Sequence, residues 1–147
     1  DFYFTECVCD DNSNYGIQYE RTSDLIVNTG MQQCQFESNN GGDRVALEVS
    51  KLVEEKGGRC NITTKYTESN KETKIIVNAD WVKKHVLFRD REHYTPKEDY
   101  GKMMGFLLSY SVRGKNPHDD VPDGLAAFAL FVTTGFVRPA SIIQSPV

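Results

Sequence analysis

Three carboxylates crowd into five positions near the end of the chain, at Asp119, Asp120 and Asp123 within the segment His118–Ala126. Like charges this close repel one another unless a cation lies between them. A helix start would explain one of them, because an aspartate caps free N–H groups and Pro122 suits a first helical turn. Three aspartates are more than one helix start requires. We therefore favour a hard-cation site that prefers Mg²⁺ or Mn²⁺ to zinc, with helix capping as the alternative.

A fourth carboxylate, Glu37, ends a strand expected over residues 32–37 and is followed by the polar, glycine-rich turn 38–42. The carboxyl end of a strand facing such a loop is where open α/β sheets place their sites. The alternative is a solvated glutamate at a strand end. Taken with the aspartate cluster, Glu37 leads us to expect one shared divalent-metal site.

Two lysines, Lys71 and Lys74, lie three residues apart within Ser69–Ile75. On a helix this spacing puts both on one face, where they could contact a phosphate backbone. Ordinary solvated lysines are the alternative. For His118 the sequence leaves three roles open: a metal ligand, a proton shuttle or a simple loop residue.

Composition limits the class of protein that can carry these residues. A chain of 147 residues suits a single domain, and no apolar run approaches the roughly 20 residues of a membrane helix. The start Asp1–Glu6 does not read as a signal peptide, which favours the cytosol. The net charge of −4 gives no global attraction to nucleic acid but leaves room for a local basic patch.

The four cysteines have none of the spacing of a zinc site, so we interpret them as reduced, small core residues. They are Cys7, Cys9, Cys34 and Cys60.

The elements that must position the candidate residues alternate along the chain. Apolar periodicity and turn residues predict strands over 2–9, 32–37, 59–66 and 86–88, and helices over 43–56, 70–84, 96 to about 114 and from about 120. A short helix before Gly30 is also expected. Ser69 is the expected N-cap of the 70–84 helix, and Thr95–Glu98 has the pattern of a capping box. The order β, α, β, α, β, α, β, α, α predicts a single α/β fold with a mixed sheet.

Three segments in order resemble the C-terminal nuclease domain of tailed-bacteriophage large terminases: Glu37–Gly42, Ser69–Ile75 and His118–Ala126. The opening Asp1–Glu6 also looks like the second strand of that domain. The resemblance covers nearly the whole chain. It implies an RNase H-like (RuvC-like) fold over residues 1–134 with an irregular tail over 135–147.

The resemblance also implies a function, a metal-dependent endonuclease that cuts concatemeric double-stranded DNA during packaging. Glu37, Asp119, Asp120 and Asp123 would bind Mg²⁺ or Mn²⁺ as two ions about 4 Å apart, and Lys71 would stabilise phosphate charge. The implied partners are an upstream ATPase domain, the portal and the small terminase subunit. The implied location is the cytoplasm of an infected or lysogenic bacterium.

The chain departs from the family pattern in one respect. The family's first strand, with its leading aspartate, should lie before Asp1. The alternatives to the nuclease are therefore a non-catalytic DNA- or portal-docking module, and a junction-resolving or RNase H-type enzyme on the same fold.

Overall fold

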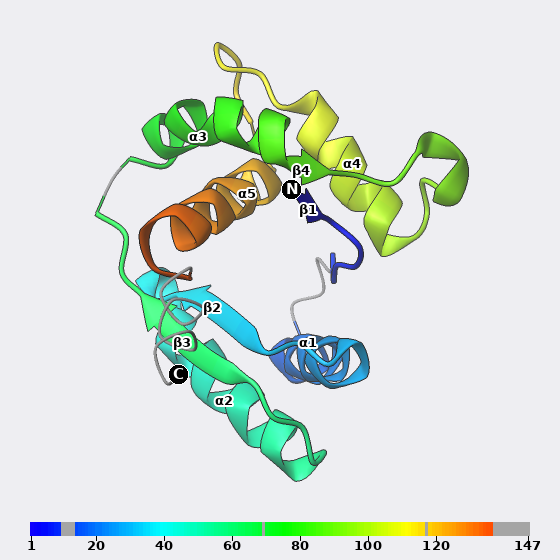
Figure 1. Ribbon diagram of the computed structural model, residues 1–147, viewed down its shortest axis with the longest axis vertical. Coiled ribbons are helices and arrows are strands. Elements are labelled where there is room, and N and C mark those ends of the chain that lie inside the picture. The colour runs from blue at the N-terminus through cyan, green and yellow to red at the C-terminus, as the bar shows by residue number, and fades with distance from the viewer. Residues whose placement is uncertain (10–13, 69, 117, 137–147) are drawn as a thin grey trace, which may run out of the picture. The chain divides into compact units, whose positions relative to one another are not determined.

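The computed structural model describes residues 1–9, 14–68, 70–116 and 118–136, and Figure 1 shows its elements. Their order is the one that the sequence predicts. The strands and α-helices are β1 (Phe2–Tyr3), α1 (Tyr15–Thr29), β2 (Gln33–Glu37), α2 (Gly42–Glu55), β3 (Asn61–Lys65), α3 (Lys71–His85), β4 (Val86–Leu87), α4 (Asp99–Ser109) and α5 (Asp120–Phe131). A π-helical turn (Val132–Phe136) follows α5, and most of the expected tail lies outside the described residues.

The strands differ from the expected single mixed sheet. Within the described residues they pair as two separate parallel sheets of two strands, β1 with β4 and β2 with β3. The strand expected over residues 2–9 is short because its partner β4 has only two residues. After Phe4 N–H donates to the Leu87 carbonyl, the Phe4 carbonyl accepts from the Tyr100 hydroxyl instead of from a strand. The α/β class is confirmed.

The chain folds as two compact units, one formed by residues 1–5 and 69–147 and the other by residues 6–68. We call them the α3–α5 unit and the β2–β3 unit. The predicted domain boundary at residue 134 lies next to residues 137–147, which the structure does not describe.

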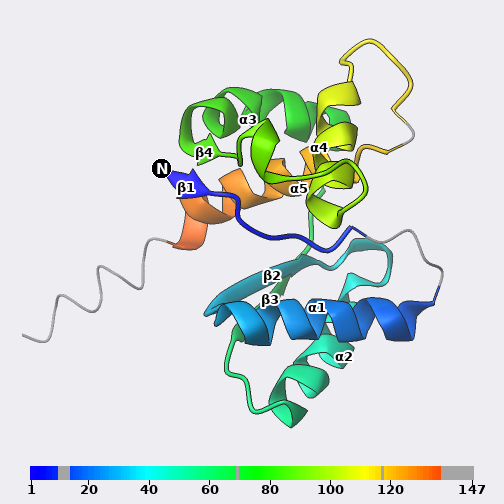
Figure 2. The same ribbon diagram turned by 90° about the vertical axis from the view of Figure 1, so that its right-hand side faces the viewer.

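The β2–β3 unit is a β–α–β arrangement whose period-two alternation separates two faces of the sheet. One face carries Cys34, Phe36 and Ile62, which pack with Val49 and Val53 of α2 in the core. Ile26 of α1 completes this core, so both helices cover the same face (Figure 2). The other face is polar.

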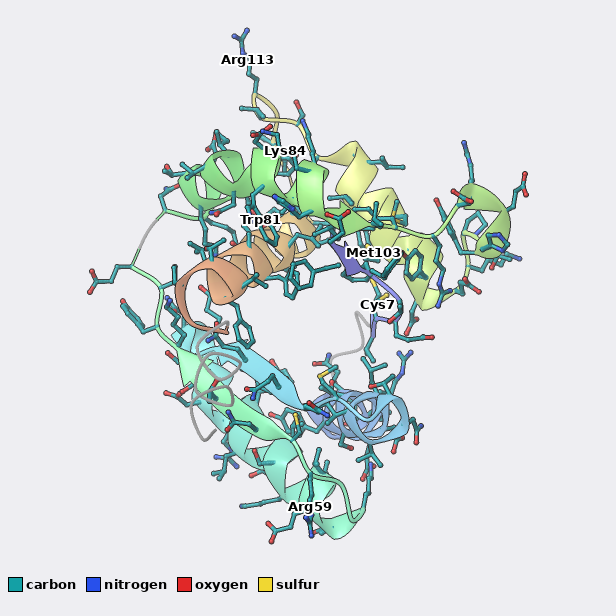
Figure 3. All side chains as sticks on the ribbon, in the orientation of Figure 1. Cys7, Arg59, Trp81, Lys84, Met103 and Arg113 are labelled. Carbon is teal, nitrogen blue, oxygen red and sulfur yellow. The ribbon has the colours of Figure 1, made fainter. Side chains whose placement is uncertain are left out.

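The α3–α5 unit is held together by apolar side chains between its helices and the short β1–β4 pair. Trp81 of α3 lies 5.9 Å from Phe2 and 6.2 Å from Phe128 of α5, measured between ring centroids (Figure 3). Tyr100 of α4 is buried against Phe4, with ring centroids 5.8 Å apart. These contacts fix α3, α4 and α5 around one small core.

The fourth helix begins and ends inside its predicted range of residues 96 to about 114. It begins only after the predicted capping box Thr95–Glu98, so that prediction is wrong. α4 starts at Asp99, and the preceding segment turns so that Thr95 lies over the first helical turn. A Cβ at Gly101 would meet the Thr95 carbonyl oxygen at 1.8 Å, which shows how closely the two segments approach. At its other end α4 stops at Ser109, and Asn116 bonds to both backbone groups of Ser111 beyond it.

Each of the four cysteines is partly buried. Cys34 and Cys60 pack against the core of the β2–β3 unit, as the interpretation of small core residues predicts. Burial, together with the nearby Cys60, raises the pKa of the Cys34 thiol to about 11. Among the described helices, we find none long and apolar enough to span a bilayer.

Candidate functional site

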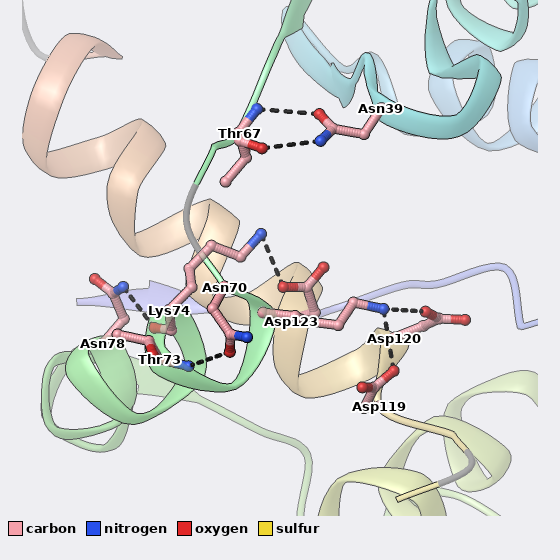
Figure 4. A network of polar contacts seen from close by, with 10 residues as sticks. Asn39, Thr67, Asn70, Thr73, Lys74, Asn78, Asp119, Asp120 and Asp123 are labelled. Atoms are coloured by element: carbon pink, nitrogen blue, oxygen red, sulfur yellow. Dashed lines mark hydrogen bonds and ion pairs between the residues drawn. The ribbon is translucent and has the colours of Figure 1, made fainter.

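Two helix starts meet in the α3–α5 unit, where α3 packs along α5 (Figure 4). α3 begins at Lys71 because the side chain of Asn70 accepts a hydrogen bond from the Thr73 N–H at 3.2 Å. Asn70 therefore serves as the N-cap, and Ser69, the predicted cap, lies outside the described residues. α5 begins at Asp120, and its first turn is closed by the Asp123 N–H donating to the Asp119 carbonyl.

The outer part of the cluster is one lysine between two carboxylates. The ammonium of Lys71 donates to Oδ1 of Asp119 at 3.0 Å and to Oδ1 of Asp120 at 3.1 Å. The three side chains are solvent-accessible to different degrees, with 44% of Lys71, 33% of Asp119 and 94% of Asp120 exposed. Residues 48 positions apart in the sequence thus meet at one charged point.

The helix-capping interpretation of the aspartates can be checked at Asp119. This residue occupies the N-cap position of α5, yet its side chain makes no capping hydrogen bond. Its carboxylate bonds to Lys71 instead. Asp120 still benefits from the helix dipole, but capping does not account for where these two carboxylates point.

The inner part of the cluster is a buried ion pair. The ammonium of Lys74 lies 2.8 Å from Oδ1 of Asp123, and only 2% and 9% of the two side chains are exposed. The contact is an ion pair rather than an aligned hydrogen bond, because Oδ1 of Asp123 accepts no hydrogen bond from the described residues. The expectation that Lys74 faces a phosphate backbone beside Lys71 is wrong, since Lys74 is buried under α5.

The electrostatics of the outer part favour a charged lysine. Partial burial alone would lower the pKa of Lys71. The hydrogen bonds and negative charges of Asp119 and Asp120 outweigh that effect and raise the pKa above its usual value. Lys71 is therefore a cation at any physiological pH.

The donor set can be compared with the needs of a hard divalent ion. Two carboxylate oxygens converge on one cationic atom, and the buried Oδ1 of Asp123 has no hydrogen bond of its own. Oxygen ligands of this kind suit Mg²⁺ or Mn²⁺. Within the described residues no three His, Cys, Asp or Glu side chains are grouped closely enough to hold a metal. The residues fit part of a site, with the Asp119–Asp120 pair as its centre.

Glu37 belongs to the β2–β3 unit, and the structure shows why a turn follows it. It is the last residue of β2, paired in register with Lys65 of β3. The side chain of Asn39 bonds twice to the backbone of Thr67, donating at 2.8 Å and accepting at 3.0 Å. A Cβ at Gly42 would lie 1.6 Å from the Glu37 carbonyl oxygen, so only glycine fits there.

The turn therefore explains most of the segment Glu37–Gly42 by local geometry. The geometry of the turn does not explain why residue 37 carries a carboxylate. Its role as a metal ligand stays a prediction.

His118 lies before α5 and is exposed. Its ring lies 4.7 Å from that of Phe106 of α4, centroid to centroid. The contact explains the position of the ring by packing.

Comparison with protein-family models, curated proteins and solved structures found no match for this chain.

Proposed function

We propose that this chain is the metal-dependent endonuclease domain of a viral DNA-packaging terminase, with an RNase H-like fold. The observation that carries the proposal is a contact between two of the segments that resemble the terminase nuclease family. Lys71, from Ser69–Ile75, bonds to both Asp119 and Asp120, from His118–Ala126. Segments that merely resembled a family by chance would have no reason to come together in space.

The second support is the direction of the carboxylates. Asp119 leaves its capping position unused, and both aspartates turn to a cation. Asp119 and Asp120 would hold the metal, with Asp123 beside them. A bound metal supplies a Lewis acid that activates water and stabilises charge on a phosphodiester.

The roles of the chain's own residues follow from their positions. Lys71 is a permanent cation at the edge of the cluster, suited to a phosphate oxygen. Lys74 holds Asp123 and thereby fixes α3 against α5. Because the net charge is −4, grip on double-stranded DNA would be local, directed at the backbone and sensitive to salt. The proposed partners are an upstream ATPase domain, the portal and the small terminase subunit, in the cytoplasm of an infected or lysogenic bacterium.

One observation favours a second candidate, a non-catalytic docking module of the packaging motor. Lys71 already bridges the two aspartates and offsets one of their two charges, so the cluster can serve as a purely structural ion-pair network. Such a module would bind DNA or the portal without cutting.

Nicking of supercoiled plasmid DNA in Mn²⁺ separates the two candidates. The wild-type chain should nick, and the double variant Asp119→Asn/Asp120→Asn should lose that activity. A matched control is Asp80→Asn, which removes another exposed aspartate paired with a lysine on α3 itself. Equal activity in the double variant, or no Mn²⁺-dependent nicking by the wild type, would refute the nuclease.

A further inference from the structure

We propose that the loop over residues 110–116, between α4 and α5, binds the backbone of double-stranded DNA through Arg113 and Lys115. The inference rests on the proposed function and deepens it, because it names the part of the chain that would contact the DNA. The loop lies outside the group formed by Lys71, Asp119 and Asp120.

One side chain holds this loop in a defined conformation. Asn116 accepts a hydrogen bond from the Ser111 N–H at 2.9 Å and donates to the carbonyls of Ser111 at 2.7 Å and Gly114 at 3.1 Å. The Gly114 N–H also donates to the Ser111 carbonyl, at 3.3 Å, and closes the turn. A loop that is ordered before binding loses little conformational freedom when it binds, so this bracing favours a contact role.

The loop presents two cations that are available to an external anion. Arg113 and Lys115 lie two residues apart and are exposed, and Figure 3 shows Arg113 projecting away from the helices of its unit. Neither forms an ion pair with any residue that the structure describes. Lys71, Lys74 and Lys84 of the same unit each pair with an aspartate instead. Phosphate oxygens suit both loop cations, the guanidinium through several donors and the ammonium as a point charge.

The chain on either side of the loop is tied to the region where α3 and α5 begin. Burial raises the pKa of Tyr110, which follows α4, and the nearby negative charges of Glu72 and Asp119 raise it further. Beyond the loop, the ring of His118 lies 4.7 Å from that of Phe106, centroid to centroid. DNA bound to the loop would therefore lie beside the candidate site.

The charges in this region explain why a DNA backbone would need the two loop cations. Glu72, Asp119 and Asp120 are negative, and Lys71 offsets only one of these charges. Approaching phosphates would be repelled, and the net charge of −4 gives no attraction from the chain as a whole. A duplex offers a row of phosphates, which fits two cations on one short loop, and such contacts require no particular base sequence.

Fluorescence anisotropy of a labelled DNA duplex, in EDTA and over a series of NaCl concentrations, tests the inference without cleavage. For Arg113→Gln/Lys115→Gln we expect binding about tenfold weaker or more at about 0.1 M NaCl, and a plot of log affinity against log salt that is less steep by about 1.8, since each phosphate contact contributes about 0.9. The matched control Arg91→Gln/Lys97→Gln removes an exposed arginine and an exposed lysine that precede α4, at the other end of this 11-residue helix. The control should keep the wild-type slope.

A third variant, Asn116→Ala, tests the bracing of the loop. It keeps both cations, so the salt slope should stay that of the wild type. The affinity should fall severalfold, because the loop would have to become ordered on binding. Fluorescence of Trp81 shows whether each variant keeps its fold.

The outcomes distinguish this inference from the proposal beneath it. An unchanged slope in Arg113→Gln/Lys115→Gln, an equal loss in the control, or no salt-dependent binding by the wild type would overturn the loop as a DNA contact. Wild-type affinity in Asn116→Ala would overturn the role of bracing. If the loop variant loses affinity as expected while the wild type shows no Mn²⁺-dependent nicking, the loop contact stands and the nuclease fails; nicking by the wild type with an unchanged slope gives the converse.

Discussion

The buried pair of Lys74 and Asp123 allows a quantitative prediction. Replacing Lys74 with methionine removes the cation and leaves the carboxylate of Asp123, which is only 9% exposed, without its ion-pair partner. Breaking a buried ion pair on one side costs about 3–5 kcal/mol. A typical domain is stable by about 5–15 kcal/mol, so we expect the variant to lose about a fifth or more of that free energy of unfolding.

A double substitution separates the effect of the two charges from the effect of side-chain volume. The double variant Lys74→Met/Asp123→Leu replaces both charges with apolar groups at an interface that also buries Ile75 and Leu125. Apolar replacement of a buried pair is often neutral or stabilising by about 1–4 kcal/mol. We expect the double variant to recover most of the stability that the single variant loses.

Urea denaturation followed by tryptophan fluorescence measures both effects. Trp81 is the single tryptophan of the chain and lies on α3 against Phe2 and Phe128, so its signal reports on the α3–α5 unit. The variant Lys84→Met, which removes an exposed lysine, serves as the control and should leave the midpoint of urea denaturation unchanged. A Lys74→Met variant as stable as the wild type would refute the reasoning, because a buried carboxylate would then carry no penalty.

Three further predictions concern backbone and thiol groups. Gly101→Ala should destabilise the protein strongly, since its Cβ would lie 1.8 Å from the Thr95 carbonyl oxygen; Gly105→Ala, on the same helix with open space around it, should stabilise by about 0.5–1 kcal/mol in thermal melts. Asn39→Ala should lower the stability of the β2–β3 unit by about 1–3 kcal/mol because it removes both hydrogen bonds to Thr67 after β3, and loss of protection of the Thr67 amide from hydrogen exchange would show it. With its pKa raised to about 11, Cys34 should have about a fiftyfold smaller thiolate fraction at pH 9 than an unperturbed thiol, and iodoacetamide labelling should be slow until urea unfolds the chain; equal labelling rates in the two states would contradict it.

The sequence by itself determined the elements and their order. The strand patterns over residues 32–37 and 59–66 are local properties, and they predicted both strands of the β2–β3 unit, which the structure gives as Gln33–Glu37 and Asn61–Lys65. The helical spacing of Asp43–Lys56 likewise predicted α2, which the structure gives as Gly42–Glu55. These predictions hold because they depend on neighbours within a few residues.

Helix ends and strand lengths depended on distant contacts. The predicted start of the fourth helix at Pro96 was wrong because Thr95 turns back over the helix at Gly101, which local preferences do not register. The strand expected up to Cys9 stopped early because β4 offers only two residues for pairing. Pairing of strands into one sheet or two is likewise decided by partners far away in the chain.

At the candidate site, only the tertiary structure could separate Lys71 from Lys74. Their spacing puts both on one face of α3, but spacing carries no information on how deeply α5 covers each position. The structure leaves Lys71 exposed to bridge Asp119 and Asp120, and it buries Lys74 against Asp123. Depth of burial decides whether a lysine can move to a ligand, and it arises from the packing of one helix on another.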